Sequence, residues 1–302
     1  MRRNGFLAIA LLAAAVVICA ASAANAFDVV NLWPSTPPGD KAEQYQDAGG
    51  PYYTPRMEFW RPENQTTDAC IIICCGGCYN GVAYDVEGVM PRDFFVEHGI
   101  AVCMLWYRTP RRPNVEKHYA AWQDVQRAIR LVRSNAEAWN ISPDKIGVMG
   151  FSAGGHLCLM AATSSMTQTY DAVDDADKLP CNANFAIPVY PAYALDDGVD
   201  GENTGRGNDA QLVDDFKFDA QTPPMCFIHG DGDGYSSMAS VMAYRQLRKM
   251  GIPGEMHVYA YANHAFFNCG PDAPIRKYPQ RVFEWLQTIN ILDCPESAKV
   301  EH

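Results

Sequence analysis

A serine lies at the centre of the glycine-rich pentapeptide at residues 150–154, which reads Gly-Phe-Ser-Ala-Gly. An apolar run at 145–149 precedes it and a helix-forming run at 155–162 follows it, so Ser152 is expected on a sharp turn from a strand into a helix. Such a turn holds the hydroxyl clear of its neighbours and requires small residues around it. The helix amino terminus favours a developing negative charge. The pattern predicts that Ser152 is a nucleophile, and a packing turn without chemistry is the alternative.

A nucleophilic serine needs a base and an acid that orients the base, and after a turn of this kind the expected chain order is serine, acid, histidine. The apolar run at 225–228 is followed by a glycine-rich loop that carries Asp231 and Asp233 at the carboxyl end of a predicted strand. Both aspartates suit the position of the acid. His264 lies on a later loop, after a predicted helix and strand, and is the base that we predict.

The other histidines occupy positions that suit a base less well. His156 lies one helical turn after Ser152 and is expected to face away from it, as a hydrogen-bonded structural histidine. The remaining five lie near predicted helix ends, in or at the end of strands, or at the chain terminus: His98, His118, His229, His257 and His302.

A glycine-rich loop at 76–81 follows the buried-strand run at 68–75, and its backbone N–H groups are candidates to bind an oxyanion. The loop begins within a C-x-x-C pattern, Cys75 to Cys78, which also fits a dithiol site. The flanking sequence lacks the small βαβ pattern of thioredoxin-like proteins, so we expect a local disulfide or a pair of buried thiols without a redox function. No metal site is expected either, because the loop with Asp231 and Asp233 lacks the later ligands of a calcium loop.

The first 26 residues have the pattern of a secretory signal peptide. Basic residues at 2–3 precede an apolar run at 6–20 and a small-residue cleavage site at 24–26. Its removal would leave residues 27–302 and would take the formal net charge from −11 to −13, because Arg2 and Arg3 are lost. Such an acidic chain is not expected to bind nucleic acid or an acidic membrane surface, and a secreted or periplasmic location is expected.

Ten of the eleven cysteines follow the predicted signal peptide, in a compartment that permits disulfides. Cys181, Cys269 and Cys294 lie in loop-like segments and are better candidates for bridges than the cysteines in apolar runs, which are Cys70, Cys103, Cys158 and Cys226. The sequence does not give the pairing.

Continuous apolar runs alternate with helical patterns over residues 27–302, without a repeat or a linker. The runs at 101–107, 145–149, 184–189 and 225–228 are typical of parallel strands that are buried on both faces. The pattern predicts one α/β domain whose mostly parallel central sheet has helices on both faces, including a helix over 119–140. Residues 28–60 are expected to add antiparallel edge strands, and residues 195–215 to form a solvated loop or a short lid.

The segments 122–134 and 141–157 resemble the helix, strand and serine turn of α/β-hydrolase esterases in the acetyl-xylan-esterase-like and hormone-sensitive-lipase-like group. The resemblance runs from about residue 57 to residue 286. It places the acid on Asp233, with Asp231 as the second candidate, and the base on His264. It implies a secreted serine esterase that hydrolyses short, chiefly acetyl, esters on carbohydrates without a cofactor.

The loop after the first central strand departs from that group, which usually has His-Gly-Gly-Gly or Pro-Gly-Gly-Gly where this chain has Cys-Gly-Gly-Cys. By position, the resemblance assigns the oxyanion-binding N–H groups to Gly77, Cys78 and Ala153. Aromatic residues near the expected strand ends are candidates to stack on a sugar ring, with core packing as the alternative: Tyr79, Trp106, Tyr107 and Tyr193.

Two other functions remain open at this point. A secreted peptidase of the prolyl-oligopeptidase type shares the residues and their order, but ordinarily carries a propeller domain that has no counterpart here. A catalytically inactive hydrolase-like binding module is the other alternative, and the presence of Ser152, Asp233 and His264 argues against it. The sequence does not give the oligomeric state.

Overall fold

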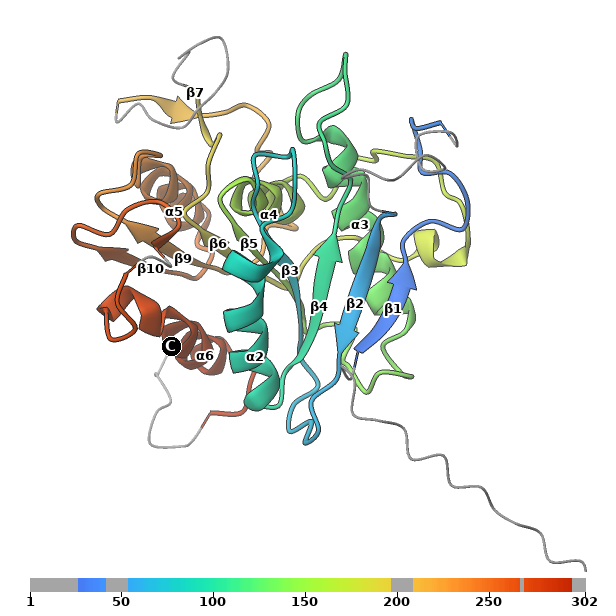
Figure 1. Ribbon diagram of the computed structural model, residues 1–302, viewed down its shortest axis with the longest axis horizontal. Helices are drawn as coiled ribbons and strands as arrows, with labels where there is room; N and C mark the ends of the chain where they lie inside the picture. Colours follow the sequence, from blue (N-terminus) through green and yellow to red (C-terminus); the bar gives the residue numbers. More distant parts are fainter. Residues whose placement is uncertain (1–26, 42–53, 197–208, 267–268, 295–302) are drawn as a thin grey trace, which may run out of the picture.

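One eight-stranded sheet forms the centre of the molecule (Figure 1). The computed structural model describes residues 27–41, 54–196, 209–266 and 269–294, so the predicted signal peptide at 1–26 lies outside the described residues. The strand order is β1-β2-β4-β3-β5-β6-β9-β10. The strands are β1 Phe27–Asn31, β2 Arg56–Trp60, β3 Cys70–Cys74, β4 Ala101–Trp106, β5 Ile146–Phe151, β6 Phe185–Val189, β9 Met225–Gly230 and β10 Gly254–Tyr259.

The sheet is parallel from β4 to β10, and β1 and β2 add an antiparallel edge. Every residue of β3, β5, β6 and β9 is buried, as expected for parallel strands that are covered on both faces. The mostly parallel sheet and the antiparallel edge predicted from residues 28–60 are therefore confirmed.

Helices cover both faces of the sheet and enclose two apolar cores. One core contains residues of α3 (Tyr119–Ser134), α4 (Ala153–Thr163) and α5 (Met238–Met250), and the other contains residues of α2 (Val89–Glu97) and α6 (Tyr278–Thr288). Short helical turns complete the set: η1 Tyr84–Gly88, η2 Asp175–Lys178 and η5 Pro274–Lys277.

The helix predicted over 119–140 ends earlier, at Ser134. The Asn135 N–H is shared between the Leu131 and Val132 carbonyls, and the Ala136 N–H donates to Arg133, three residues back, at 3.4 Å. Turns follow over 135–140 and lead into β5.

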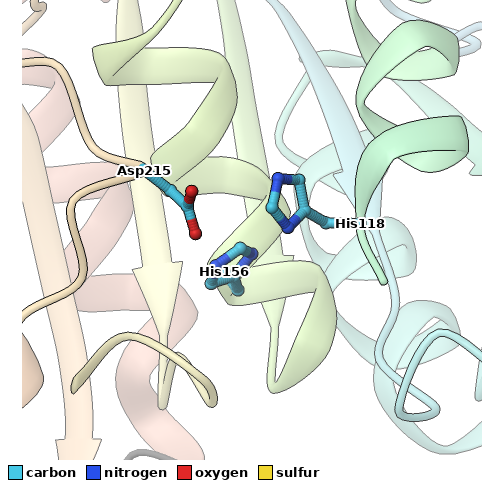
Figure 2. Close-up of side chains that lie close together, drawn as sticks. All are labelled: His118, His156 and Asp215. Carbon is cyan, nitrogen blue, oxygen red and sulfur yellow. The ribbon is translucent and has the colours of Figure 1, made fainter. Parts of the chain in front are cut away.

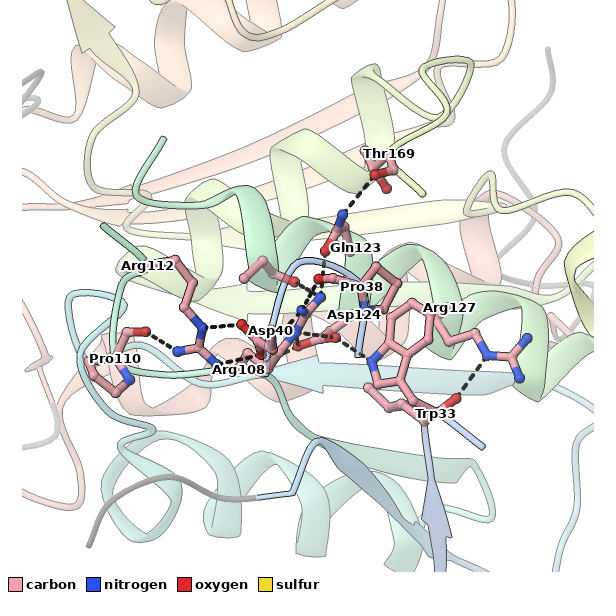
Figure 3. A network of polar contacts seen from close by, with 12 residues as sticks. Trp33, Pro38, Asp40, Arg108, Pro110, Arg112, Gln123, Asp124, Arg127 and Thr169 are labelled. Carbon is pink, nitrogen blue, oxygen red and sulfur yellow. Dashed lines mark hydrogen bonds and ion pairs between the residues drawn. The ribbon is translucent and has the colours of Figure 1, made fainter. Parts of the chain in front are cut away.

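A buried charge network fixes the chain between β4 and α3 (Figure 3). The Arg108 side chain, which is almost fully buried, donates from Nε to Asp124 on α3 at 3.0 Å and from Nη2 to Gln123 at 2.6 Å. Nearby, Arg112 donates to both carboxylate oxygens of Asp40 at 2.6 and 2.8 Å. A buried ion pair whose hydrogen bonds are all made keeps the chain in one conformation. This network therefore fixes the position of Arg111, which lies between Arg108 and Arg112 in the sequence.

The predicted loop or lid at 195–215 is described only at its two ends. There β7 (Leu195–Asp196) and β8 (Gln211–Leu212) pair antiparallel, while residues 197–208 lie outside the described residues. Among the helices that the structure describes, none is long and apolar enough to span a membrane.

Candidate active site

Ser152 lies between β5 and α4 on the sharp turn that the sequence predicts. Its backbone has φ 53° and ψ −119°, a conformation that non-glycine residues rarely adopt and that the surroundings must enforce. A Cβ on Gly150 would lie 1.9 Å from the carbonyl oxygen of Gly154, and a Cβ on Gly154 would lie 2.0 Å from that of Cys74. Both glycines are therefore required for β3, β5 and α4 to approach closely enough to form the turn.

The structure brings Ser152, His264 and Asp233 together in a hydrogen-bonded row. The imidazole of His264 contacts the Ser152 hydroxyl through Nε2 at 2.8 Å and the Asp233 carboxylate through Nδ1 at 2.8 Å. These residues come from the turn after β5, the loop after β9 and the loop after β10. Asp231, the second candidate for the acid, is exposed to solvent, and the carboxylate that His264 contacts is that of Asp233.

Asp233 lies in surroundings that favour its ionised form. Its side chain is fully buried, and its other carboxylate oxygen accepts the Tyr235 N–H at 2.7 Å. Burial alone would raise the pKa of Asp233, but interactions with His229 and His264 outweigh it and hold the pKa below its ordinary value. Asp233 is therefore a carboxylate at neutral pH and accepts the Nδ1 proton of His264, which leaves Nε2 as the basic nitrogen toward Ser152.

Two tyrosines hold the His264 ring in place. Its centroid lies 4.9 Å from that of Tyr190 and 4.6 Å from that of Tyr235. The His264 side chain is about a quarter exposed, at 26%, so one part of the ring is open to solvent while its two nitrogens are bound. An imidazole whose ring and nitrogens are both held is pre-organised for proton transfer.

The loop after β3 adopts the left-handed region at three consecutive residues, with φ 127° at Gly77, 56° at Cys78 and 58° at Tyr79. Among the described residues, the N–H groups of Gly77 and Cys78 have no hydrogen-bond acceptor. Ala153 is the first residue of α4, so its N–H has no acceptor within the helix either. All three predicted donors thus have N–H groups available to an anion.

Two hydrogen bonds fix the ends of this loop. Glu87, a buried residue of η1, accepts the Gly76 N–H, and the Arg111 guanidinium donates from Nε to the Cys78 carbonyl at 3.0 Å. Burial raises the pKa of Glu87, against the opposing effect of the hydrogen bonds from Gly76 and Tyr190. The sequence analysis did not identify Glu87 or Arg111, because neither belongs to a motif and both reach the site only through the fold.

Tyr79 and Tyr193, two predicted substrate contacts, are both buried. Tyr79 is fully buried, and its hydroxyl lies 2.8 Å from Nδ1 of His156. Tyr193 is 6% exposed, and Lys117 Nζ lies 4.5 Å from its ring centroid. The fully buried Tyr79 ring packs within the protein, so the core-packing alternative is correct for Tyr79. Tyr193 is exposed to the same extent as Ser152, so its contact with substrate stays a prediction. His156 is the buried, hydrogen-bonded histidine that was expected.

Trp106 and Tyr107 are also bound by other parts of the protein. Trp106 donates from Nε1 to Glu58 at 2.8 Å, stacks on Tyr84 and lines a groove of about 640 Å³. None of the three residues in the hydrogen-bonded row lines that groove. Tyr107 is buried and donates from its hydroxyl to the Cys75 carbonyl at 2.5 Å. The structure therefore places neither ring among the contacts around the serine.

The cysteines of the loop are thiols. No disulfide joins Cys75 and Cys78, and only Cys75 is buried, so the expected pair of buried thiols is wrong for the exposed Cys78. Cys181 and Cys269, predicted to be better candidates for bridges, are also thiols, so that prediction is wrong for both. Cys181 donates instead to the Ser165 carbonyl at 3.3 Å, which shows that a cysteine in a loop can be held without a partner sulfur.

Comparison with known proteins identifies relatives of this arrangement. Residues 57–197 match the model of the BD-FAE family. The chain is 28% identical over 225 residues to an acetylxylan esterase of Xylanibacter ruminicola, a match that covers 70% of this chain and 43% of the relative. The chain thus spans less than half the length of this relative.

Solved structures of similar fold include two esterases. An acetyl ester-xyloside bifunctional hydrolase from Caldicellulosiruptor lactoaceticus matches with a TM-score of 0.72 and 22% identity, over 90% of this chain and all of that one. The esterase Est2 from Thermogutta terrifontis, with propionate bound, matches with a TM-score of 0.64 and 22% identity, over 80% of this chain and 92% of that one. MGS-M1, an α/β hydrolase from a Medee basin deep-sea metagenome library, matches with a TM-score of 0.63 and 20% identity, over 89% of this chain and 98% of that one. The α/β-hydrolase fold expected from the sequence is thereby confirmed.

Proposed function

We propose that this chain, an acetyl-xylan-esterase-like α/β hydrolase, is a secreted serine esterase that removes acetyl groups from carbohydrates. The observation that carries the proposal is the row of 2.8 Å contacts from Ser152 through His264 to Asp233. Three residue types in this order and spacing are the machinery of nucleophilic acyl transfer.

His264 Nε2 takes the Ser152 proton as Oγ attacks the ester carbonyl carbon. Asp233 keeps the Nδ1 proton in place and stabilises the imidazolium that forms. The imidazolium then gives its proton to the departing alcohol, and a water molecule activated by the same nitrogen hydrolyses the acyl-enzyme. Each step uses a side chain of this protein, so the reaction requires no metal or cofactor.

The tetrahedral intermediate carries its negative charge on the former carbonyl oxygen. We assign its binding to the N–H groups of Gly77, Cys78 and Ala153, which have no acceptor within the described backbone. The Cys78 contribution comes from the backbone, because the loop already holds that residue at φ 56°. Glu87 and Arg111 act as positioning residues, since they hold the loop without contacting the reacting atoms.

Three observations support a carbohydrate acetyl ester as the substrate. The N-terminal sequence predicts export, which gives access to external polymers. The acidic net charge disfavours polyanionic substrates such as nucleic acids. The acetylxylan esterase relative and the acetyl ester-xyloside hydrolase share this reaction class by their names.

The test is the rate of hydrolysis across a series of p-nitrophenyl esters and acetylated xylo-oligosaccharides. The proposal predicts that kcat/KM is highest for acetyl and falls for butyryl and longer esters, and that acetate is released from the oligosaccharides. A steady rise in rate with acyl length would indicate a lipase-like pocket. Release of product from an aminoacyl-proline amide, with no acetate release, would support the peptidase alternative.

A further inference from the structure

Two buried histidines and an aspartate lie close together (Figure 2). His118 precedes α3, His156 lies on α4 one turn after Ser152, and Asp215 lies on the segment that follows β8. One nitrogen from each imidazole and one carboxylate oxygen all lie within 4.8 Å of one another. The mechanism proposed above uses none of these three side chains.

The three side chains lie close together without forming hydrogen bonds to one another. Within the described part of the chain, neither the His118 ring nor the Asp215 carboxylate has a hydrogen-bond partner, although the two imidazole centroids are only 5.1 Å apart. Each neutral imidazole offers one lone pair and the carboxylate offers two oxygens, so three ligand atoms that converge without bonding to one another leave a place for a bound cation.

The outer contacts leave a ligand nitrogen available on His156. Its Nδ1 lies 2.8 Å from the hydroxyl of the fully buried Tyr79. If Nδ1–H donates to that hydroxyl, Nε2 carries the lone pair, which is the arrangement that metal-binding histidines usually show. Burial lowers the pKa of both His118 and His156.

We propose that His118, His156 and Asp215 form a binding site for a divalent transition-metal ion, with zinc as the best match. Two imidazoles and one carboxylate are a ligand set that zinc takes in tetrahedral geometry, with the fourth position filled by water or another group. Adjacent ligand atoms around zinc lie roughly 3.4 Å apart, given bond lengths of about 2.0–2.1 Å. The side chains would therefore close inward by about an ångström or slightly more from their present spacing.

The positive charge of Lys117 acts on this cluster, and its ammonium lies over the Tyr193 ring at 4.5 Å from the ring centroid. Lys117 contributes to the lowered pKa of both imidazoles, so its charge is felt at the site. The charge of Lys117 would lower the affinity of the site for a cation, and the carboxylate of Asp215 would raise it. Removal of the Lys117 charge should therefore tighten metal binding, which a site elsewhere on the protein would not show.

A second group of residues that could bind a metal contains Cys226, Glu255 and His257, and it differs from the first group in its hydrogen bonding. His257 Nε2 lies 2.7 Å from a Glu255 oxygen, so a hydrogen bond accounts for the proximity of these two residues. No such bond accounts for the cluster around His118. The second group serves as a matched control.

The proposed site would link four parts of the chain. Asp215 lies on a segment that Ser164, at the end of α4, holds by a 2.8 Å hydrogen bond to the Asp215 carbonyl. His118 and His156 belong to the beginning of α3 and to α4, and Tyr79 belongs to the loop after β3. Zinc would therefore stabilise the folded protein by its binding free energy.

The experiment titrates the full chain with zinc chloride after removal of metals by a chelator and dialysis. Isothermal titration calorimetry gives the stoichiometry and affinity, and thermal unfolding gives the stabilisation. We expect zinc binding at one site per chain that Asp215→Asn and His118→Gln each weaken by at least about 10- to 100-fold. The unfolding midpoint of the wild type should rise by several degrees at saturating zinc and that of the variants should not.

Two further variants separate this site from others. His257→Gln should leave the affinity unchanged, and Lys117→Gln should increase it. Asp215→Asn preserves the shape of a half-buried side chain, so its metal-free unfolding midpoint should match the wild type and exclude misfolding. Zinc binding that is absent, that Asp215→Asn leaves unchanged, or that His257→Gln abolishes would overturn the proposal.

Discussion

Glu87 accepts the backbone N–H of Gly76, so a buried carboxyl group holds the residue that packs directly against the serine. A Cβ on Gly76 would lie 2.8 Å from the Ser152 Cβ, which shows how close the two residues are. The other Glu87 oxygen accepts the Tyr190 hydroxyl at 3.1 Å, and the Tyr190 ring packs on His264. One acidic side chain is therefore connected to both the loop after β3 and the proposed base.

Replacement of Glu87 should lower turnover through this connection. Glu87→Ala leaves the Gly76 N–H and the Tyr190 hydroxyl without their acceptor, at a cost of about 1–3 kcal/mol for each buried group. We expect kcat on p-nitrophenyl acetate to fall by about 10- to 100-fold with little change in KM, and Glu87→Gln to recover much of the loss. Equal activity of Glu87→Ala and the wild type would show that the loop holds its geometry unaided.

The same residue predicts a pH dependence of stability. Burial raises the pKa of Glu87 above its ordinary value of 4.5, so the folded state binds this proton more tightly than the unfolded state does. The resulting stability is complete below pH 4.5 and is lost as the pH rises through the folded-state pKa. In denaturant titrations, the free energy of unfolding of the wild type should therefore fall relative to that of Glu87→Gln as the pH rises above 4.5. A constant difference across this range would contradict the prediction.

The two aspartates of the loop after β9 should differ strongly in their effect on catalysis. Asp233→Asn should lower kcat by about 10³ to 10⁴, because an amide favours the wrong His264 tautomer. Asp231→Asn is the matched control and should have a mild effect, since Asp231 is exposed. Kinetic constants for both variants, with circular dichroism to verify folding, make the comparison. A reversed order of effects would mean that Asp231 is the acid.

The Cys78 position tests whether the loop acts through its backbone. Cys78→Gly keeps the N–H and suits a φ of 56°, so it should retain most activity. Cys78→Pro removes the N–H and cannot adopt that φ, so it should lose at least about 10² to 10³ in kcat. Mild reduction should leave the native activity unchanged, because Cys75 and Cys78 are thiols. A folded but inactive Cys78→Gly would contradict the backbone role.

The sheet and the serine turn were predictable because they depend on local patterns. Buried parallel strands appear as continuous apolar runs, and the turn at Ser152 requires small residues that the sequence displays. The choice of Asp233 over Asp231 came from the family resemblance, since the residues themselves left both open. The end of the helix at Ser134 was not predicted, because the change to a hydrogen bond from Ala136 to Arg133, three residues back, has no signal in the sequence.

The contacts that surround the site were less predictable, because they join distant parts of the chain. Glu87 and Arg111 have no sequence signal of their own, and they reach the loop after β3 only when η1 and the chain after β4 fold beside it. Tyr79 was expected to contact substrate from its place in that loop. Its φ of 58° accompanies a buried ring that reaches His156 instead. The position of a residue in the sequence does not show whether its ring points toward the substrate or into the core.

The central claim, that Ser152 is the nucleophile and His264 its base, is tested most directly by covalent labelling with an active-site-directed phosphonate. Mass spectrometry of the intact chain and its peptides locates the adduct and counts it. We predict one phosphonyl group per chain, on Ser152, with labelling abolished in Ser152→Ala and slowed by several orders of magnitude in His264→Ala. Equal labelling of Ser152→Ala and the wild type, or an unlabelled but folded wild type, would contradict the claim.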